Sequence, residues 1–167
     1  SKEYQDYAHQ VVANAKALAE ELQKLGVRLQ TDGTDNHLML ADVTSYGLTG
    51  KQAEAAMFQA GVTVNANALP YDKNGAWYTS GLRLGTPALT TLGMKEGEMK
   101  EVASIIDQVL KGTKPGVTKD GKPAKLKIEL DPQVKKDASE RVQALLKKFV
   151  LYPELDLDFL KKEFCSL

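Results

Sequence analysis

The chain has 167 residues, enough for one domain, and its 22 basic and 22 acidic residues leave no net charge. This balance argues against a protein that binds nucleic acid or another polyanion, because such proteins usually carry a basic excess. The apolar fraction of 43% is typical of a globular domain, and no apolar run approaches the roughly 20 residues that cross a bilayer, so we expect no membrane contact.

The start of the chain predicts a piece of a longer protein. A helical pattern begins almost directly at Ser1, and residues 1–26 mix charged and apolar positions, unlike a secretory leader. Cys165 is the only cysteine, so an intramolecular disulfide is excluded. A free thiol fits a reducing compartment, and we expect the protein in the cytoplasm.

The first third of the chain predicts a helix followed by two strands. Apolar residues recur at helical spacing between residues 4 and 25 and indicate a long helix that stops at Gly26. Val27–Gln30 and His37–Val43 have the composition of two strands, and the polar residues between them indicate a turn.

The middle of the chain predicts a second helix and two short strands. Thr49 and Gln52 have the spacing of a capping box, and the helix that they start ends at Gly61. Val62–Val64 and Leu82–Leu84 are short apolar runs typical of strands.

The last third predicts helices on either side of a polar segment. Val102–Leu110 has helical periodicity, whereas residues 112–130 contain glycine, proline and many lysines and indicate a solvated surface loop. Asp131 as N-cap and Pro132 at the first helical position predict another helix. The tail, residues 153–167, alternates charged and apolar residues and predicts a short amphipathic helix.

This order of elements predicts an α+β domain, with helices on one face of a small, mainly antiparallel sheet. We expect a leading helix over residues 1–26 and a motif-bearing α+β core over residues 27–111. A lysine-rich loop over residues 112–130 and C-terminal helices over residues 131–167 would complete the domain.

Arg83 is the residue that most strongly indicates a binding site. It lies between Leu82 and Leu84 in a predicted strand, and an unpaired charge among apolar neighbours is costly. Its planar guanidinium matches a carboxylate in a bidentate arrangement, which a lysine cannot form. On the residues alone, an internal ion pair is a more common role for such an arginine than a ligand clamp.

Two asparagines and an aromatic residue form the second candidate group. Asn65 and Asn67 are two apart on an extended segment, so their amides point the same way and could meet the edge of a planar heterocycle. Capping of the turn before Pro70 is the alternative. Trp77 could stack on a ligand ring or fix a loop, and His37 could have a structural or a catalytic role. Two histidines and one cysteine give no metal-binding pattern.

Five motifs, in order, resemble the C-terminal third of the serine hydroxymethyltransferases. Together they span residues 4 to about 110. The matching motifs are Y-x-x-x-V-x-x-N-A-x-x-L-A from Tyr7 to Ala19, G-T-D-N-H-L from Gly33 to Leu38, L-T-G-K-x-A-x-x-A from Leu48 to Ala56, V-N-x-N-x-x-P from Val64 to Pro70, and T-S-G-x-R-x-G-T-P-A-x-T from Thr79 to Thr90.

The resemblance implies the small C-terminal domain of a fold-type I pyridoxal-phosphate enzyme. The family interconverts serine and glycine with tetrahydrofolate and 5,10-methylenetetrahydrofolate, using pyridoxal 5'-phosphate as an electron sink. By motif position, Arg83 corresponds to the residue that binds the substrate carboxylate. Asn67, Gly75, Ala76 and Trp77 correspond to positions that contact folate.

The chain departs from the family pattern at two places. Gly75, Ala76 and Trp77 stand where the family usually has Ser-Pro-Phe, so backbone contacts and one aromatic ring would remain. Leu92 stands where an arginine is common, which would alter the electrostatics near the site.

The resemblance also implies that the chain lacks part of the enzyme. The family's cofactor lysine lies upstream, in a large domain, so we expect no catalytic residue in this segment and no activity from the chain alone. The partners implied are serine or glycine, folate, and the N-terminal large domain, within a homodimer or homotetramer.

Two alternatives to an enzyme segment are considered. One is a stand-alone, non-catalytic module for binding or assembly, although such a module has no need of Arg83 and Asn67. The other is a different pyridoxal-phosphate enzyme, such as an aminotransferase, which the N-A-N and G-T-D-N-H-L motifs disfavour.

Overall fold

The computed structural model describes residues 1–156, 159–160 and 162. The helices are α1 (Lys2–Lys24), α2 (Gly50–Gln59), α3 (Gly75–Tyr78), α4 (Pro87–Thr91), α5 (Glu96–Lys111) and α6 (Pro132–Lys148). The strands are β1 (Arg28–Leu29), β2 (Leu38–Asp42), β3 (Asn65–Asn67), β4 (Gly81–Gly85), β5 (Thr113–Val117) and β6 (Pro123–Leu130). Within these described ranges, none of the helices combines the length and the apolar character needed to cross a membrane.

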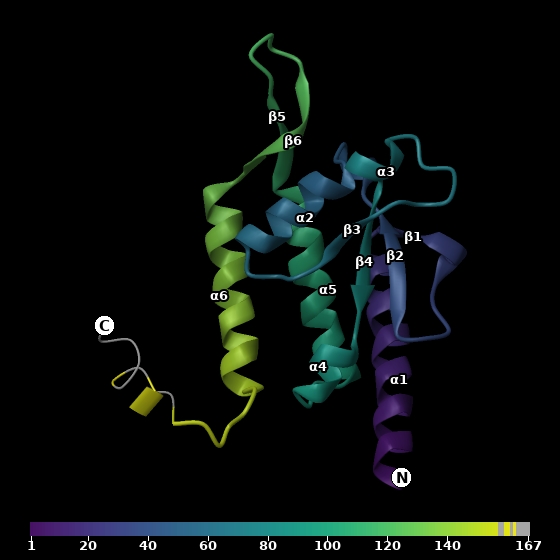
Figure 1. Ribbon diagram of the computed structural model, residues 1–167, viewed down its shortest axis with the longest axis vertical. Helices are drawn as coiled ribbons and strands as arrows, with labels where there is room; N and C mark the ends of the chain where they lie inside the picture. The colour runs from purple at the N-terminus through teal and green to yellow at the C-terminus, as the bar shows by residue number, and fades with distance from the viewer. Residues whose placement is uncertain (157–158, 161, 163–167) are drawn as a thin grey trace.

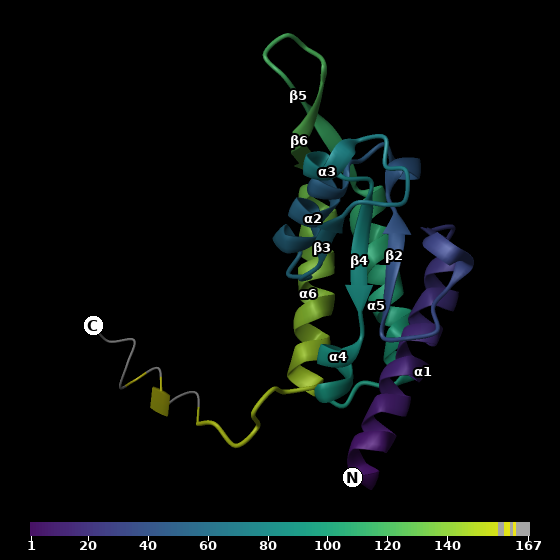
Figure 2. The ribbon, with the colours of Figure 1, turned by 45° about the vertical axis from the view of Figure 1, so that its right-hand side comes forward.

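Four strands form an antiparallel sheet in the order β1-β2-β4-β3. Helix α5 lies between α1 and α6 (Figure 1), and β2 and β4 lie in front of α5 in Figure 2. The strand side chains on the helix side are buried, among them Met39, Ala41, Leu82 and Leu84. The prediction of an α+β domain with helices on one face of a small antiparallel sheet is therefore confirmed.

Helix α1 forms where the apolar periodicity predicts it. Ser1 accepts a hydrogen bond from the backbone N–H of Tyr4, which satisfies one of the free donors at the start of the helix. The helix ends at Lys24, and Gly26, just beyond its C-cap, turns the chain with a φ of 91° that is favourable for glycine. There Val27 donates its backbone N–H to the Leu22 carbonyl at 3.0 Å, closing the helix end.

The predicted capping box of α2 is present, and it also attaches a neighbouring element. Thr49 and Gln52 exchange the two capping hydrogen bonds. The Thr49 hydroxyl also donates to the Lys125 carbonyl at 2.9 Å. Gln52 Nε2 donates to the carbonyls of Ala124 and Lys127 at 2.7 and 2.9 Å. The start of α2 is thus bonded to β6.

Residues 112–130 correct one expectation, because they form a β-hairpin and not a loop. Strands β5 and β6 pair antiparallel, with an irregularity between Pro115 and Val117, and Gly121 turns the chain at φ 75°. The hairpin projects beyond the rest of the molecule at one end (Figures 1 and 2). The glycines and prolines of this segment indicated a loop, but a two-stranded hairpin tolerates proline at an irregular position of an edge strand.

Two further expectations differ from the structure. The strand after α2 is Asn65–Asn67, while Val62 and Val64, expected to form it, are half-buried before its start. The short helices α3 and α4 were not predicted. The amphipathic helix expected over residues 153–167 lies largely outside the described residues.

Candidate functional site

One face of the sheet carries most of the residues singled out in the sequence. Alternate strand residues point to opposite faces, and directly paired residues share a face. The register pairs Arg83 with both Leu40 and Asn65, and it pairs Gly81 with Asn67. We call the side opposite the helices the open face. Its strand side chains are those of Arg28, Leu38, Leu40, Asp42, Asn65, Asn67 and Arg83.

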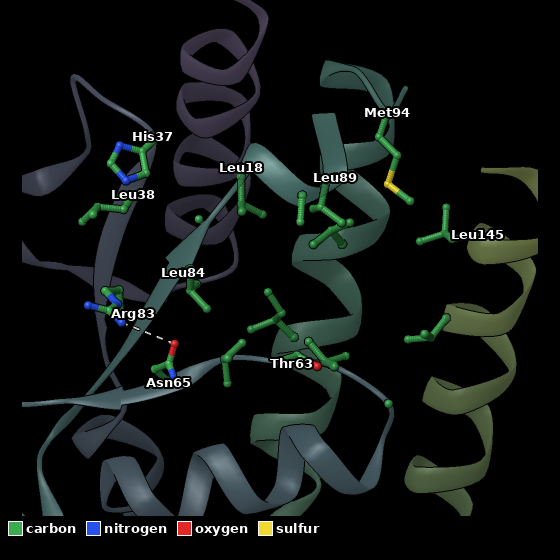
Figure 3. Close-up of a pocket in the computed structure, with 18 of the residues that line it drawn as sticks. Leu18, His37, Leu38, Thr63, Asn65, Arg83, Leu84, Leu89, Met94 and Leu145 are labelled. Carbon is green, nitrogen blue, oxygen red and sulfur yellow. Dashed lines mark hydrogen bonds between the residues drawn. The ribbon is translucent and has the colours of Figure 1, made fainter. Parts of the chain in front are cut away.

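Arg83 is exposed on this open face and has no carboxylate partner within the described residues. Within the same residues, the hydrogen bond that its guanidinium donates is a long one, 3.5 Å from Nη2 to Asn65 Oδ1, which Figure 3 shows. Arg28, on the same face, instead forms an ion pair with Asp42 at 3.6 Å. The internal ion pair that the sequence left open for Arg83 is therefore not formed in this part of the chain.

Strand β4 holds Arg83 in place because its other side is buried. Leu82 and Leu84 flank the arginine and are 0% and 4% exposed. Gly81 allows the strand to pass close to its neighbours. A Cβ at this position would lie 2.5 Å from Leu69 Cδ2 and 3.1 Å from the Ala41 carbonyl oxygen.

Strand β3, which presents Asn65 and Asn67, is held from its outer edge by a carboxylate. Glu54 accepts the backbone N–H of Ala66 at 2.9 Å and pairs with Lys51 at 2.8 Å. Burial raises the pKa of Glu54, but the hydrogen bonds from Lys51 and Ala66 more than offset it, so the pKa is lowered. Glu54 was not recognised from the sequence, although its spacing from Lys51 is that of a helical ion pair.

The connection between β3 and β4 presents the residues predicted to contact folate. Gly75, Ala76 and Trp77 are exposed, and Trp77 retains 72% of its surface. Tyr78 follows them, and the Lys125 ammonium of the hairpin lies 5.0 Å from the centre of its ring. Asn67 donates its amide Nδ2 to the Ala68 carbonyl at 2.7 Å. The exposed Trp77 ring thus lies on the connection that directly follows the edge strand β3.

Asp72 organises this connection and was not recognised from the sequence. Its carboxylate accepts backbone N–H groups of Leu69, Asn74 and Ser80 at 2.8–3.0 Å, and the Ser80 hydroxyl at 2.6 Å. Burial raises the pKa of Asp72, but these hydrogen bonds have the larger combined effect and lower it. A Pro-x-Asp sequence in a polar loop is the only signal that could have indicated this role.

Two of the sequence motifs meet directly at Gly50 and Thr79. Gly50 donates its backbone N–H to the Thr79 carbonyl at 3.0 Å. A Cβ on Gly50 would overlap the Thr79 hydroxyl and would lie 2.5 Å from the Gly81 carbonyl oxygen. Thr79 is buried at φ 57°, and its hydroxyl has no hydrogen-bond partner among the described residues. A β-branched residue rarely adopts a positive φ, so the backbone at Thr79 is strained.

The motif in α1 has a structural role. Asn14 is fully buried and donates its amide to Thr90 Oγ1 and to the Met94 carbonyl, both at 2.9 Å.

Two further residues that the sequence singled out also have structural contacts. The backbone carbonyl of His37 accepts the N–H of Thr86. Leu92 packs against the hydrophobic core.

An apolar groove of about 550 Å³ adjoins Arg83 and Asn65. Figure 3 shows these two residues at one side, with Leu84, Leu89, Met94 and Leu145 around the hollow. Its walls come from α1, β4, α4, α5, α6 and the segment before β3. In the described part of the chain, no cluster of three histidine, cysteine or acidic residues could hold a metal.

The fold is that of an α+β domain with an antiparallel sheet, on whose open face the Arg83 guanidinium lies beside the Asn65 amide and has no carboxylate partner among the described residues. The family model described as Serine hydroxymethyltransferase matches residues 1–106. A serine hydroxymethyltransferase of Salinispora tropica is 52% identical over 155 residues, which cover 93% of this chain and 32% of the relative. That of Treponema pallidum is 51% identical over 161 residues, covering 96% and 28%.

The chain belongs to the serine hydroxymethyltransferase family. A further relative, from Chlamydia abortus, is 49% identical over 95% of the chain. The chain spans about a third of the length of these curated relatives.

Proposed function

We propose that the chain is the part of a serine hydroxymethyltransferase that binds the substrate carboxylate and one side of the folate. The whole protein would interconvert serine and glycine with tetrahydrofolate and 5,10-methylenetetrahydrofolate. The observation that carries this proposal is the exposed Arg83 guanidinium, which has no carboxylate partner among the described residues. A guanidinium whose charge is not compensated by a neighbouring carboxylate in the described region is complementary to an incoming carboxylate.

The binding of the carboxylate would orient the substrate as well as retain it. Arg83 lies on a strand paired on both sides, so its backbone position is fixed by β2 and β3. Two parallel hydrogen bonds from its guanidinium would set the direction of the amino acid. Holding a reactant in one orientation contributes to rate as well as to affinity.

The folate side of the proposed site consists of Asn67, Gly75, Ala76 and Trp77. Asn67 shares the open face with Arg83, and its amide oxygen could accept from a heterocycle edge. Trp77 offers an exposed ring for stacking. Gly75 and Ala76 would contribute backbone contacts, because their small side chains leave the main chain accessible.

Pyridoxal 5'-phosphate, the family's cofactor, would be held by the remainder of the protein. No lysine is present among the strand side chains of the open face, so these residues do not fit the covalent attachment of this cofactor. We therefore assign this chain no part in anchoring it. The chain alone should be inactive and should leave the absorption spectrum of added pyridoxal 5'-phosphate without a saturable change.

The test of the carboxylate site is the affinity of the whole protein for glycine, measured by calorimetry. Arg83→Ala should weaken glycine binding on the order of 30-fold or more, since a charged hydrogen-bonding partner is lost. Arg83→Lys should restore little of it, because an ammonium cannot bind in a bidentate manner.

Arg28→Ala is the matched control, because Arg28 lies on the same face but is paired with Asp42. It should leave glycine affinity within about twofold. Unchanged glycine binding by both Arg83 variants would remove Arg83 from the carboxylate site.

A further inference from the structure

The connection between β3 and β4 is closed by a single carboxylate. Asp72 Oδ2 accepts the backbone N–H of Leu69 at 3.0 Å and that of Ser80 at 2.8 Å. Its Oδ1 accepts the Asn74 N–H at 2.8 Å and the Ser80 hydroxyl at 2.6 Å. Leu69 follows β3 closely, and Ser80 directly precedes β4. The four bonds therefore join the two ends of the connection.

The backbone of this connection would not hold its shape unaided. Tyr71 and Thr79 both have a φ of 57°, although neither is glycine. Such conformations are uncommon for residues with a Cβ and persist only where the surroundings enforce them. Asp72 is adjacent to one of these residues, and its partner Ser80 is adjacent to the other, so its bonds act where the backbone is least favourable.

The shape enforced by Asp72 determines where the folate-side residues lie. Gly75, Ala76 and Trp77 lie between Asn74 and Ser80, both of which are bonded to the carboxylate. Asn74 also donates its amide to the Ser80 hydroxyl at 3.1 Å. The exposed tip is thus carried on a base that is fixed before any ligand arrives.

We infer that Asp72 is a positioning residue for the folate side of the site, which pre-forms the loop that presents Gly75, Ala76 and Trp77. This inference rests on the proposed function, since it assumes that the loop contacts folate. In this inference Asp72 acts through the loop, because its two oxygens already accept four hydrogen bonds from the connection itself. Its effect is to remove the cost of ordering the loop on binding, which raises affinity without adding a contact.

The ionised carboxylate is required, because both of its oxygens accept two hydrogen bonds. An asparagine of the same shape could satisfy only one side. Its NH₂ group would face either the donors of Leu69 and Ser80 or those of Asn74 and Ser80. Asp72→Asn is therefore a conservative change that should release one half of the closure.

The experiment measures the affinities of the whole protein for tetrahydrofolate and for glycine separately, by calorimetry. Asp72→Asn should weaken tetrahydrofolate binding on the order of 10- to 100-fold, while glycine affinity stays within about twofold. Trypsin cleavage after the exposed Lys73 should become faster in the variant, because the loop opens more often.

Asp131→Asn is the matched control. Asp131 also accepts two backbone N–H groups, from Gln133 and Val134, but at the start of α6. This variant should change neither tetrahydrofolate affinity nor cleavage after Lys73. If Asp72→Asn does not fold, Ser80→Ala removes one hydroxyl bond to the same carboxylate, and it should weaken tetrahydrofolate binding by a few fold.

Trp77→Ala and Asn67→Ala separate this inference from the proposed function. If they weaken tetrahydrofolate binding and Asp72→Asn does not, the positioning role is overturned and the folate site stands. If neither variant changes tetrahydrofolate affinity, the proposed folate contacts fail, and the positioning role fails with them. Equal weakening of tetrahydrofolate and glycine by Asp72→Asn would also overturn the inference.

Discussion

The two sides of strand β4 differ in their surroundings: one is buried against the helices and the other is open to solvent. On the helix side, Leu82 and Leu84 are buried in the hydrophobic core. On the open face, Arg83 between them is exposed and makes one long hydrogen bond. Neighbouring residues of one short strand are therefore divided between the hydrophobic core and the proposed carboxylate site, because strand geometry turns every second side chain to the other face.

The hydrophobic core also fixes the position of the strand that carries Arg83. The leucines and the pairing with β2 and β3 set the position of the backbone from which the Arg83 side chain extends. Substitutions on the helix side should act first on folding, and those on the open face should act first on binding.

The largest effect is expected at Leu82, which is completely buried. Leu82→Ala should lower the free energy of unfolding by about 2–5 kcal/mol, through lost burial and the cavity left behind. Urea denaturation followed by circular dichroism measures this change. A loss under about 1 kcal/mol would contradict the assignment of this side of β4 to the core.

Gly50→Ala should be the next most damaging change. The new Cβ would overlap Thr79 and approach the Gly81 carbonyl, so we expect a loss of about 1–3 kcal/mol in the same denaturation experiment. Gly97→Ala is the control, because a Cβ at this helical position meets no atom within 4 Å. It should be neutral or stabilising by up to about 1 kcal/mol. Equal effects of the two changes would show that Gly50 is not needed for the contact.

Acid should weaken the molecule partly through Asp72. Its pKa is lowered from 3.8 in the folded protein, so the stability it contributes is complete above that value and is lost as the pH falls through the lower, folded pKa. The free energy of unfolding of Asp72→Asn should therefore fall less steeply than that of the unmodified chain below about pH 4. Parallel curves in acid denaturation would contradict this contribution.

The smallest effect on stability is expected at Arg83 itself. Arg83→Ala should change the free energy of unfolding by no more than about 0.5 kcal/mol, because the side chain is exposed and lacks a charged partner in the described region. This result, together with the expected loss of glycine binding, would sharpen the separation between the two sides of β4. Strong destabilisation would break it.

Much of the fold follows from local signals in the sequence. The periodicity of α1, the capping box at Thr49 and the Asp131–Pro132 start of α6 predict helices that the structure contains. The hairpin formed by β5 and β6 did not follow, since its attachment depends on Gln52, more than 70 residues away in sequence. Side-chain hydrogen bonds across such distances have no local signature.

The candidate site was predictable in part. Alternation along a strand places Arg83 and Leu82 on opposite faces, and the spacing of Asn65 and Asn67 places both on one side. The bonds that Asp72 and Glu54 form with distant backbone groups depend on the folded geometry. The local sequence therefore indicated the residues exposed in the proposed site better than the residues that hold them in place.

The closure of the loop by Asp72 has a consequence for protein engineering. The fixed ends, at Leu69 and Ser80, are separate from the exposed tip at Gly75, Ala76 and Trp77. Because the tip residues take no part in these hydrogen bonds, we expect that they can be replaced without a change in the fixed ends of the loop. A library randomised only at these three residues would explore new ligand preferences on an unchanged frame.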